Sequence, residues 1–409
     1  MVRVAIVGIG GYGWELIGKL REAAAEGRCQ LVAAADNNLG ELFHEADELR
    51  RLEVELFSDA VTMLEAYRKR CDAVYIASGI HTHAPLAIAA AEAGYHVHLE
   101  KPPAATVQEV DRMLAALGAH KRMCLVGFQA IHSDDIRFVK ERVVSGRLGE
   151  VKWLSCCAGW PRKRGYYLRN SWAGELRTGT HWVLDGPATN ALSHQLMNML
   201  FLASARPEGF ATPGSVRGEL YVAGPVSSHD TAAIEVRTAE GPAIFLLVSH
   251  CTEENFGPVI EIAAEKGRVR WAMGKGATIT YNDGTSESCP PDPDSGRKKM
   301  VLNFLEAVAE NDPGRLRCPL GASRGFVLAL DGAHESSVRI RRIPREHVRR
   351  VGEGDEATTV VAGLDEMLRR AAAEPCLLSD LPERPSWVVA TEQFNLAGYD
   401  RFPRRFIPG

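Results

Sequence analysis

The chain has 409 residues, of which 45% are hydrophobic and 24% are charged, and its formal net charge is −4. This length allows two domains, and this charge gives no electrostatic reason to expect nucleic acid or an anionic membrane as a partner. No apolar run approaches the roughly 18 residues of a transmembrane helix, and the first predicted strand begins too early to leave room for a signal peptide. The nine cysteines include no C-x-x-C pair. We therefore expect reduced thiols in a cytoplasmic protein.

The beginning of the chain carries a pattern typical of dinucleotide binding. The β-branched run Val2–Val7 predicts a strand buried on both faces of a parallel sheet, and Trp14–Ala25 has helical apolar spacing. Between them lies a G-x-G-x-x-G turn, in which the glycines allow a tight turn, a close approach to a pyrophosphate and close packing of helix on strand. Phosphates would lie at the N-terminus of the helix. The expected cofactor-binding residues of this turn are Gly8, Gly10, Gly11, Tyr12 and Gly13.

A second predicted strand, Gln30–Ala35, ends in Asp36. Asp36 follows the glycine turn by about 20 residues, the interval expected of an acid that binds the ribose hydroxyls. A carboxylate here would repel a 2′-phosphate, which carries about −1.5 to −2 charges. We therefore expect NAD rather than NADP as the cofactor.

Strands and helices alternate as far as Phe128, which predicts an α/β domain with a doubly wound parallel sheet of the Rossmann type. Ligands of such sheets bind beyond the carboxyl ends of the strands. Ser78–His83 and Glu100–Pro102 both follow predicted strands, and so join Asp36 and the glycine turn at this edge. The expected helices are Leu39–Arg51, Ala60–Arg70, Ala84–Ala93 and Thr106–Leu117, and the further strands are Asp72–Ala77, Tyr95–Leu99 and Met123–Phe128.

The remainder of the chain shows a different pattern of predicted elements. After a predicted strand at Glu150–Cys157 and a predicted helix at Thr189–Ala203, short alternating segments run from residue 215 to residue 281 and predict a largely antiparallel open sheet. We expect three parts: a dinucleotide-binding Rossmann domain at 1–128, a substrate-binding and oligomerisation α/β domain at 129–338, and a C-terminal extension at 339–409 that packs on the second domain.

Several segments resemble the Gfo/Idh/MocA family of nicotinamide-dependent sugar and cyclitol oxidoreductases: GIGGYG, AAAD, SGIHTHAPLAIAAAEAGYHVHLEKP, VGFQ and SGRLGEVKWLS. The similarity extends from the N-terminus to about Leu200 and continues weakly to about Ser337. It implies NAD as the cofactor, a carbohydrate-like substrate, and a homo-oligomer (dimer or tetramer) formed through the second-domain sheet. The E-K-P after a strand is its most specific part. The remaining expected cofactor-binding residues are Ser78, His83, Glu100 and Lys101.

By this resemblance, Lys101 hydrogen-bonds the reacting hydroxyl, and its charge would stabilise a developing alkoxide. The alternative is a solvated lysine at a strand end. Pro102 favours an extended conformation at Lys101, and the family often has a cis peptide bond before this proline. His83 is expected to shape the nicotinamide end of the cleft.

His194 is the second catalytic candidate. The family pattern at this place is D-x-G-x-H-x-x-D, and His194 matches its histidine, whereas Asn190 and Met197 stand where the aspartates are expected. Asn190 and His194 are four residues apart and would share one face of a regular helix. His194 would act as the general base in alcohol oxidation, or else it is a hydrogen-bonded histidine of the domain core.

Asp185 and His181 are also four apart, just before this segment. One or both replace the missing carboxylates, or Asp185 simply caps the helix; the sequence leaves these alternatives equal. We include Asp185 with Lys101 and His194 as a catalytic candidate.

The segment Trp160–Gly174 is rich in aromatic residues and arginine, and suits a polyhydroxylated or acidic ligand. The run Arg162–Arg164 is expected to face solvent. The expected substrate-binding residues are Lys101, Tyr166, Tyr167, Arg169, Asn170, Trp172, His181, Asn190 and His194.

The pairs His81/His83 and His96/His98 lack companions at zinc spacing, so no metal site is expected. The leading hypothesis is an NAD-dependent oxidoreductase that moves a hydride between nicotinamide and a secondary alcohol of a sugar, sugar acid or cyclitol. The alternative is a glycoside-cleaving or epimerising enzyme with tightly bound NAD that acts through a keto intermediate. A third hypothesis is a non-catalytic dinucleotide-binding regulator.

Overall fold

The computed structural model describes residues 1–408 and divides the chain into two compact units. The first unit contains Met1–His132 and Asp294–Arg324, and the second contains Ser133–Pro293 and the chain from Gly325 onward. Residues 294–324 thus return to the first unit and pack on its core, which differs from the continuous second domain expected at 129–338.

The first unit is built on a parallel sheet of six strands in the order β3-β2-β1-β4-β5-β6. The order reverses between β1 and β4, which creates the switch point where doubly wound sheets bind ligands. The expected Rossmann-type α/β fold is thus confirmed. The strands are β1 (Val2–Val7), β2 (Cys29–Ala35), β3 (Glu55–Phe57), β4 (Ala73–Ile76), β5 (His96–Leu99) and β6 (Cys124–Val126). The helices between them are α1 (Tyr12–Ala25), α2 (Phe43–Arg51), α3 (Ala60–Ala66), α4 (Ile80–Ala93) and α5 (Val107–Ala119), and η1 (Gln129–His132) follows β6.

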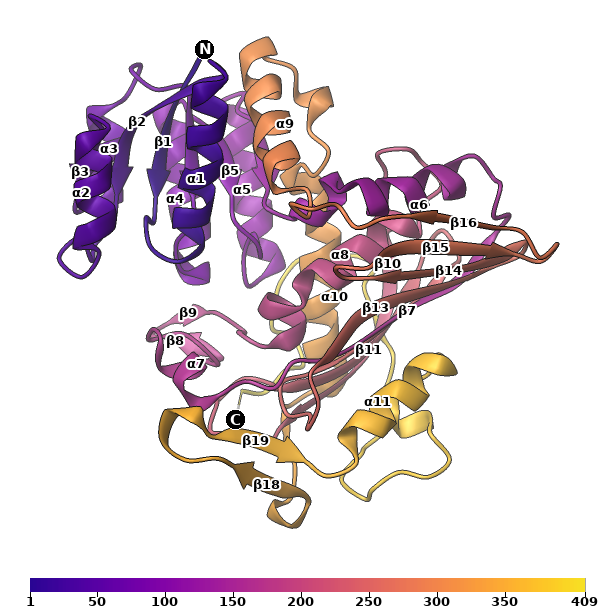
Figure 1. The fold of residues 1–409 in the computed structure, drawn as a ribbon. Coiled ribbons are helices and arrows are strands. Elements are labelled where there is room, and N and C mark those ends of the chain that lie inside the picture. Colours follow the sequence, from indigo (N-terminus) through magenta and orange to yellow (C-terminus); the bar gives the residue numbers. More distant parts are fainter. Residues whose placement is uncertain (409) are drawn as a thin grey trace. The chain divides into compact units, whose positions relative to one another are not determined.

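Helix α9 (Arg297–Glu310) completes the first unit, although it begins 171 residues after the end of β6 at Val126. Met300 and Phe304 are fully buried in the same apolar core as Val4 and Leu16. In Figure 1, α9 (orange) lies beside α1 and β1 (indigo). Burial of such side chains contributes about 1.5–3 kcal/mol each, so this core holds α9 on the first unit.

The second unit contains a mixed, largely antiparallel sheet in the order β16-β15-β14-β13-β7-β12-β11-β10-β17, with β20 also pairing with β10. Only the pairs β7/β12 and β10/β17 are parallel. The expected sheet is confirmed, with strands added at both edges. Its strands are β7 (Val151–Gly159), β10 (Pro213–Val222), β11 (Thr231–Thr238), β12 (Ala243–Ser249), β13 (Phe256–Ala264), β14 (Gly267–Ala272), β15 (Gly276–Tyr281), β16 (Ser286–Cys289), β17 (Arg341–Arg342) and β20 (Phe394–Asn395).

Helices α6 (Asp134–Val144) and α8 (Ser193–Leu202) pack on this sheet, and the division between the units falls within α10 (Leu320–Ser337). The C-terminal extension supplies β17, β20 and helix α11 (Leu364–Ala373). Ser155 of β7 donates a hydrogen bond of 3.0 Å to the carbonyl oxygen of Ala372, and Cys157 packs on the apolar cluster around Leu368. The extension therefore covers one face of the sheet.

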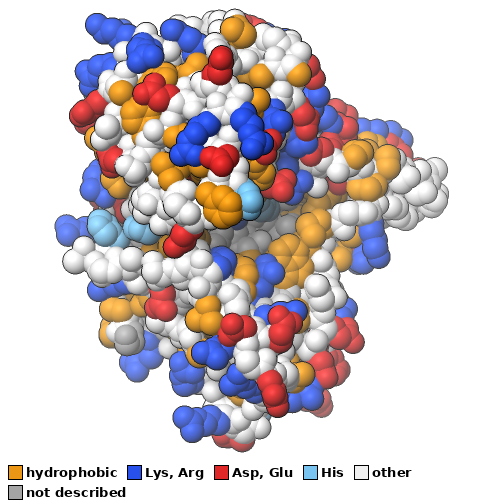
Figure 2. Space-filling model, turned by 60° about the vertical axis from the view of Figure 1, so that its left-hand side comes forward, with side chains coloured by type: hydrophobic (Ala, Val, Ile, Leu, Met, Phe, Trp, Pro, Cys, Tyr) orange, Lys and Arg blue, Asp and Glu red, His pale blue; other side chains and the backbone are white. Residues whose placement is uncertain are grey.

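Among residues 1–408, no helix combines the length and the apolar character needed to cross a bilayer. On the face drawn in Figure 2, acidic and basic side chains are interspersed. This distribution agrees with the small net charge of the chain.

Candidate cofactor and substrate sites

The glycine turn joins β1 to α1 at the carboxyl edge of the first sheet. A Cβ atom at Gly8 would lie 2.3 Å from the carbonyl oxygen of Ala77, and one at Gly13 would lie 2.1 Å from the carbonyl oxygen of Gly8. Gly8 and Gly11 also have φ angles of 88° and 53°, which favour glycine. A Cβ atom at Gly10 would lie 3.1 Å from the side chain of Leu42. The turn thus brings bare backbone to the N-terminus of α1, where a phosphate is favoured.

Asp36 lies at the end of β2 and binds the same turn. Its carboxylate accepts hydrogen bonds from the backbone N–H of Ile9 (3.0 Å) and of Asn38 (2.9 Å). A carboxylate offers about four lone-pair sites, so acceptor capacity remains for two ribose hydroxyls. The turn and Asp36 together fit an NAD molecule.

Tyr12, in the first turn of α1, connects the glycine turn to the end of β6. Its hydroxyl donates a hydrogen bond of 3.3 Å to Oε1 of Gln129. Burial, followed by the charge of Glu100, raises the pKa of Tyr12 well above its usual range. Tyr12 is therefore a neutral hydroxyl that positions the turn.

His83 lies on the first turn of α4, because that helix begins at Ile80 rather than at the expected Ala84. Its Nδ1 is 2.8 Å from the carbonyl oxygen of Pro102, and its Nε2 is 3.0 Å from the carbonyl oxygen of Ser78. Burial lowers the pKa of His83 to about 4. This neutral imidazole joins two of the loops at the cofactor edge, and the Lys101–Pro102 peptide bond beside it is cis. The hydroxyl of Ser78 is 2.6 Å from that of Thr82 in the same helix.

Glu100 and Lys101 follow β5 and differ in burial. Glu100 is only 5% exposed and packs against Gly127, where a Cβ atom would come within 2.3 Å of its Oε1. Burial raises the pKa of Glu100 to about 7, opposed by the charge of Lys101. Its Oε2 accepts a hydrogen bond of 3.2 Å from the backbone N–H of Lys101. Glu100 thus supports the backbone of Lys101, whose own side chain is half-buried.

In the second unit, the expected aromatic residues cluster around helix α7 (Arg164–Leu168). The rings of Tyr166 and Tyr167 meet edge to face at 5.2 Å between centroids, and the guanidinium of Arg169 lies 3.7 Å from the Tyr166 centroid and 5.5 Å from that of Trp172. Asn170 uses its side-chain oxygen to accept hydrogen bonds from the backbone N–H of Trp172 and of Ala173. Its oxygen therefore shapes the loop.

Asp185 is buried and contacts Asn190. Its Oδ1 accepts a hydrogen bond of 2.7 Å from Nδ2 of Asn190, and its Oδ2 accepts one of 2.6 Å from the backbone N–H of Gly174. Gly186, not Asp185, precedes the first turn of the following helical segment. Asp185 thus joins the aromatic loop to Asn190.

The regular helix expected at Thr189–Ala203 is interrupted, and this expectation was wrong. Residues Pro187–Ala191 form a π-helical turn, η2, and Leu192 leaves the helical conformation at φ −112° and ψ 16° before α8 begins at Ser193. Asn190 and His194 therefore do not follow one another on a continuous α-helix. π-Turns of this kind are frequent at functional sites.

His181 and Asp185 also differ from the expected helical pair. His181 is exposed on the short strand β9 (His181–Trp182), which pairs with β8 (Arg177–Thr178). His194 is the second residue of α8 and is half-buried.

Sequence reasoning missed two neighbours of the aromatic cluster. His250 follows β12, and its Nδ1 is 2.9 Å from the carbonyl oxygen of Trp160. Arg162, expected in solvent, is half-buried with its guanidinium 4.5 Å from the Tyr166 centroid. The place of His250 directly after a buried apolar strand was the available signal.

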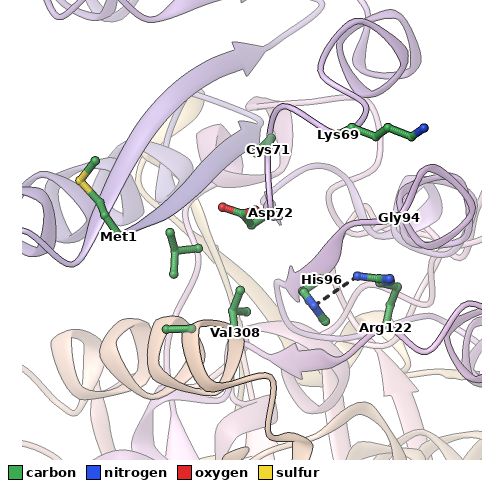
Figure 3. Close-up of a pocket in the computed structure, with 10 residues that line it drawn as sticks. Met1, Lys69, Cys71, Asp72, Gly94, His96, Arg122 and Val308 are labelled. Atoms are coloured by element: carbon green, nitrogen blue, oxygen red, sulfur yellow. Dashed lines mark hydrogen bonds between the residues drawn. The ribbon is translucent and has the colours of Figure 1, made fainter.

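A pocket of about 440 Å³ lies at the opposite edge of the first sheet, at the amino ends of β1, β4 and β5 (Figure 3). His96 and Arg122 point toward one another there, with Nε2 and Nη1 3.5 Å apart. None of the expected site residues lines this pocket. Residues 1–408 contain no group of three or more His, Cys, Asp or Glu side chains arranged to hold a metal ion.

Residues 2–128 match the model of the family described as "Oxidoreductase family, NAD-binding Rossmann fold". The first unit is thus an NAD-binding Rossmann domain, as its glycine turn and Asp36 indicate. This match is confined to the Rossmann domain and agrees with the resemblance to the Gfo/Idh/MocA family noted in the sequence.

Among the similar proteins, inositol 2-dehydrogenase of Pseudomonas fluorescens is 27% identical over 196 residues, which cover 48% of this chain and 52% of that protein. A 2,7-anhydro-N-acetylneuraminate hydratase of Mediterraneibacter gnavus is 30% identical over 166 residues, 40% of this chain and 41% of that protein. The match therefore spans about half the length of these relatives or less. The WlbA dehydrogenase of Bordetella pertussis, solved with NADH and UDP-GlcNAcA, shares the fold with a TM-score of 0.69 at 23% identity, over 82% of this chain and 96% of that chain.

Proposed function

We propose that the protein is an NAD-dependent oxidoreductase that moves a hydride between nicotinamide and a secondary alcohol of a sugar, sugar acid or cyclitol. The observation that carries this proposal is the gathering of the glycine turn, Asp36 and the Glu100–Pro102 segment at the carboxyl edge of one family-matched sheet. The similarity to an inositol 2-dehydrogenase supports a small polyhydroxylated substrate.

Bound NAD would supply the hydride acceptor. Lys101 would donate a hydrogen bond to the reacting hydroxyl, and its positive charge would stabilise the alkoxide that develops as the proton leaves. Burial of Glu100 beside the Lys101 backbone limits the positions that Lys101 can adopt. This arrangement supports a fixed donor rather than a solvated lysine.

His194 would remove the hydroxyl proton as general base, a role worth roughly 10²–10⁴ in rate. Asn190 has no titratable group and donates its amide to Asp185. The buried Asp185 would therefore act through Asn190 and the Gly174 loop, as a positioning residue, whereas His181 would bind substrate from the exposed strand β9.

A second candidate is a glycoside-cleaving or epimerising enzyme that keeps its NAD bound and passes through a ketone of the substrate. The similarity to a 2,7-anhydro-N-acetylneuraminate hydratase favours it, as does the replacement of the expected aspartate by Asn190. In this case Lys101 and His194 would keep their roles in moving the hydroxyl proton.

The test is to incubate the purified protein with NAD and a panel of hexoses, uronates, inositols and glycosides while measuring NADH at 340 nm and products by chromatography. NADH that accumulates with consumed substrate supports the oxidoreductase. Product formation without net NADH supports the second candidate. If neither occurs on any member of the panel, both proposals fail.

The proposal includes a homo-oligomer, a dimer or tetramer, formed through the sheet of the second unit. The extension already covers β7 near Ser155, whereas β14 and β15 alternate buried with exposed residues, among them Arg270 and Thr278. Light scattering after size exclusion should give a molar mass that is two or four times 44.7 kDa. The variant Arg270→Glu should lower this molar mass. A single species of 44.7 kDa would contradict this part of the proposal.

A further inference from the structure

Two arginines share one aromatic ring in the second unit. The guanidinium carbons of Arg162 and Arg169 lie 4.5 and 3.7 Å from the centroid of Tyr166. Arg162 is also 5.4 Å from the ring of Trp160, and Arg169 is 5.5 Å from that of Trp172. We name Arg162, Tyr166 and Arg169 the arginine–tyrosine cluster. Its aromatic contacts hold two positive charges close together.

Neither guanidinium of the cluster forms a salt bridge within residues 1–408. Arg169 donates a hydrogen bond of 2.5 Å to the carbonyl oxygen of Tyr166, and Nε of Arg162 is buried without a hydrogen-bond partner. Arg162 is half-buried and Arg169 is exposed, whereas the half-buried Arg142 and Arg217 of this unit contact the carboxylates of Glu287 and Asp380. The charge of the cluster is thus left without a direct counterion.

The neighbouring titratable groups do not remove this charge. Asp185, the acid whose charge acts on Tyr166, accepts hydrogen bonds from Gly174 and Asn190 and forms no salt bridge with Arg162 or Arg169 within residues 1–408. His250, whose ring is 6.1 Å from that of Tyr166, has its pKa lowered to about 3 by burial and then by the Arg162 guanidinium. It is therefore neutral and adds no charge of either sign.

We propose that the arginine–tyrosine cluster binds an anionic group of the substrate, a carboxylate or a phosphate. The proposal rests on the proposed function and narrows its substrate class to acidic sugars. Guanidinium groups offer forked donors that match both kinds of anion. The faces of Tyr166 and Trp172 would pack on the C–H groups of the sugar ring.

The test compares anionic sugars with their neutral counterparts on the NAD-loaded protein. Calorimetric binding and kcat/KM for NADH formation are measured with glucuronate, galacturonate, glucose 6-phosphate, glucose and galactose. We expect at least one anionic sugar to bind at least tenfold more tightly than its neutral counterpart. Whether the uronates or the phosphate show the preference identifies the group that is bound.

The variants Arg162→Gln and Arg169→Gln should each lower the ratio of anionic to neutral sugar affinity at least tenfold. Arg164→Gln is the matched control, because the Arg164 side chain is exposed and its backbone N–H donates a hydrogen bond to the carbonyl oxygen of Ala357. This variant should keep the preference, and melting temperatures show that all three proteins fold.

Equal binding of anionic and neutral sugars would overturn the inference, as would equal losses in Arg162→Gln and Arg164→Gln, or no binding of any anionic sugar. Specific binding of an anionic sugar without any turnover would contradict the proposed function but support the anion site. Turnover of neutral sugars alone would support the proposed function but contradict the anion site.

Discussion

The side-chain amide of Asn190 donates a 2.7 Å hydrogen bond to the buried carboxylate of Asp185. At position 190 the family pattern has an aspartate, and here the acid is found five residues earlier. Because an amide can donate to a carboxylate whereas a second carboxylate cannot, Asn190 makes the buried charge of Asp185 tolerable. The chain thus departs from the family pattern at position 190, and the Asn190–Asp185 hydrogen bond compensates for that change within one unit.

Asn190→Asp should therefore destabilise the protein in a pH-dependent way. Two carboxylates at hydrogen-bond distance cannot both ionise, so one acquires a raised pKa in the folded state. A raised folded-state pKa gives stability that is present at low pH and is lost as pH rises. We expect the melting temperature to fall by several degrees relative to wild type at pH 8 and by much less at pH 5. An equal loss at both pH values would show that the contact is not electrostatic.

The glycine turn gives a prediction with a control on the same helix. Gly13→Ala places Cβ against the carbonyl oxygen of Gly8, which is backbone and cannot move aside without disturbing the turn. We expect NAD affinity to fall at least tenfold and the melting temperature to drop. Gly18→Ala, also in α1, meets nothing within 4 Å and should stabilise the helix by about 1 kcal/mol. Calorimetric NAD binding and thermal unfolding check both, and equal behaviour would contradict the packing role of Gly13.

Asp36 should set the preference for NAD over NADP. Asp36→Asn removes the negative charge. It also places a side-chain NH2 group opposite one of the two backbone N–H groups that donate hydrogen bonds to the carboxylate. We expect the ratio of NAD to NADP affinity to fall at least tenfold, a change of about 1.4 kcal/mol. The control is Asn37→Ala, at an exposed neighbouring position. An unchanged ratio of NAD to NADP affinity in Asp36→Asn would mean that another residue discriminates between the 2′-hydroxyl and the 2′-phosphate.

His98 makes the first unit sensitive to acid. It is fully buried, stacked on Tyr75 at 4.5 Å and 5.6 Å from Phe304, and burial lowers its pKa to about 3. Between pH 6.5 and 3 the unfolded chain binds a proton that the folded state excludes, so stability falls as pH falls. Between pH 7 and pH 5, the free energy of unfolding should fall by about 2 kcal/mol less in His98→Phe than in wild type. Chemical denaturation measures this difference, and the exposed-site variant His120→Gln should match wild type.

Local sequence signals located most of the first unit. The strand β1, the glycine turn and Asp36 were predictable because each is specified by neighbouring residues: an apolar run, a fixed glycine spacing, and an acid at a strand end. Asp59 likewise caps α3 locally, accepting a hydrogen bond from the backbone N–H of Thr62. The edge strand β3 was missed because it has only three residues.

Contacts between residues that are distant in the chain could not be predicted from the sequence. Nothing in the apolar spacing of residues 297–310 tells which core Phe304 enters. The break at Leu192 was also hidden, because residues 189–203 carry helical spacing on both sides of it and the π-turn depends on tertiary contacts such as that of Asn190 with Asp185. The arginine–tyrosine cluster depends similarly on how the loop folds, so Arg162 looked like a solvated charge.

We propose that Lys101 and His194 both take part in the oxidation of the substrate alcohol. The most direct measurement is kcat/KM for NADH formation with the best substrate of the panel, in wild type, Lys101→Met and His194→Gln, beside calorimetric NAD affinity for each protein. We predict that each substitution lowers kcat/KM by roughly 10²-fold or more while NAD affinity stays within threefold. If either variant keeps kcat/KM within a few-fold of wild type, that residue does not take part in catalysis, and the account given for the site is contradicted.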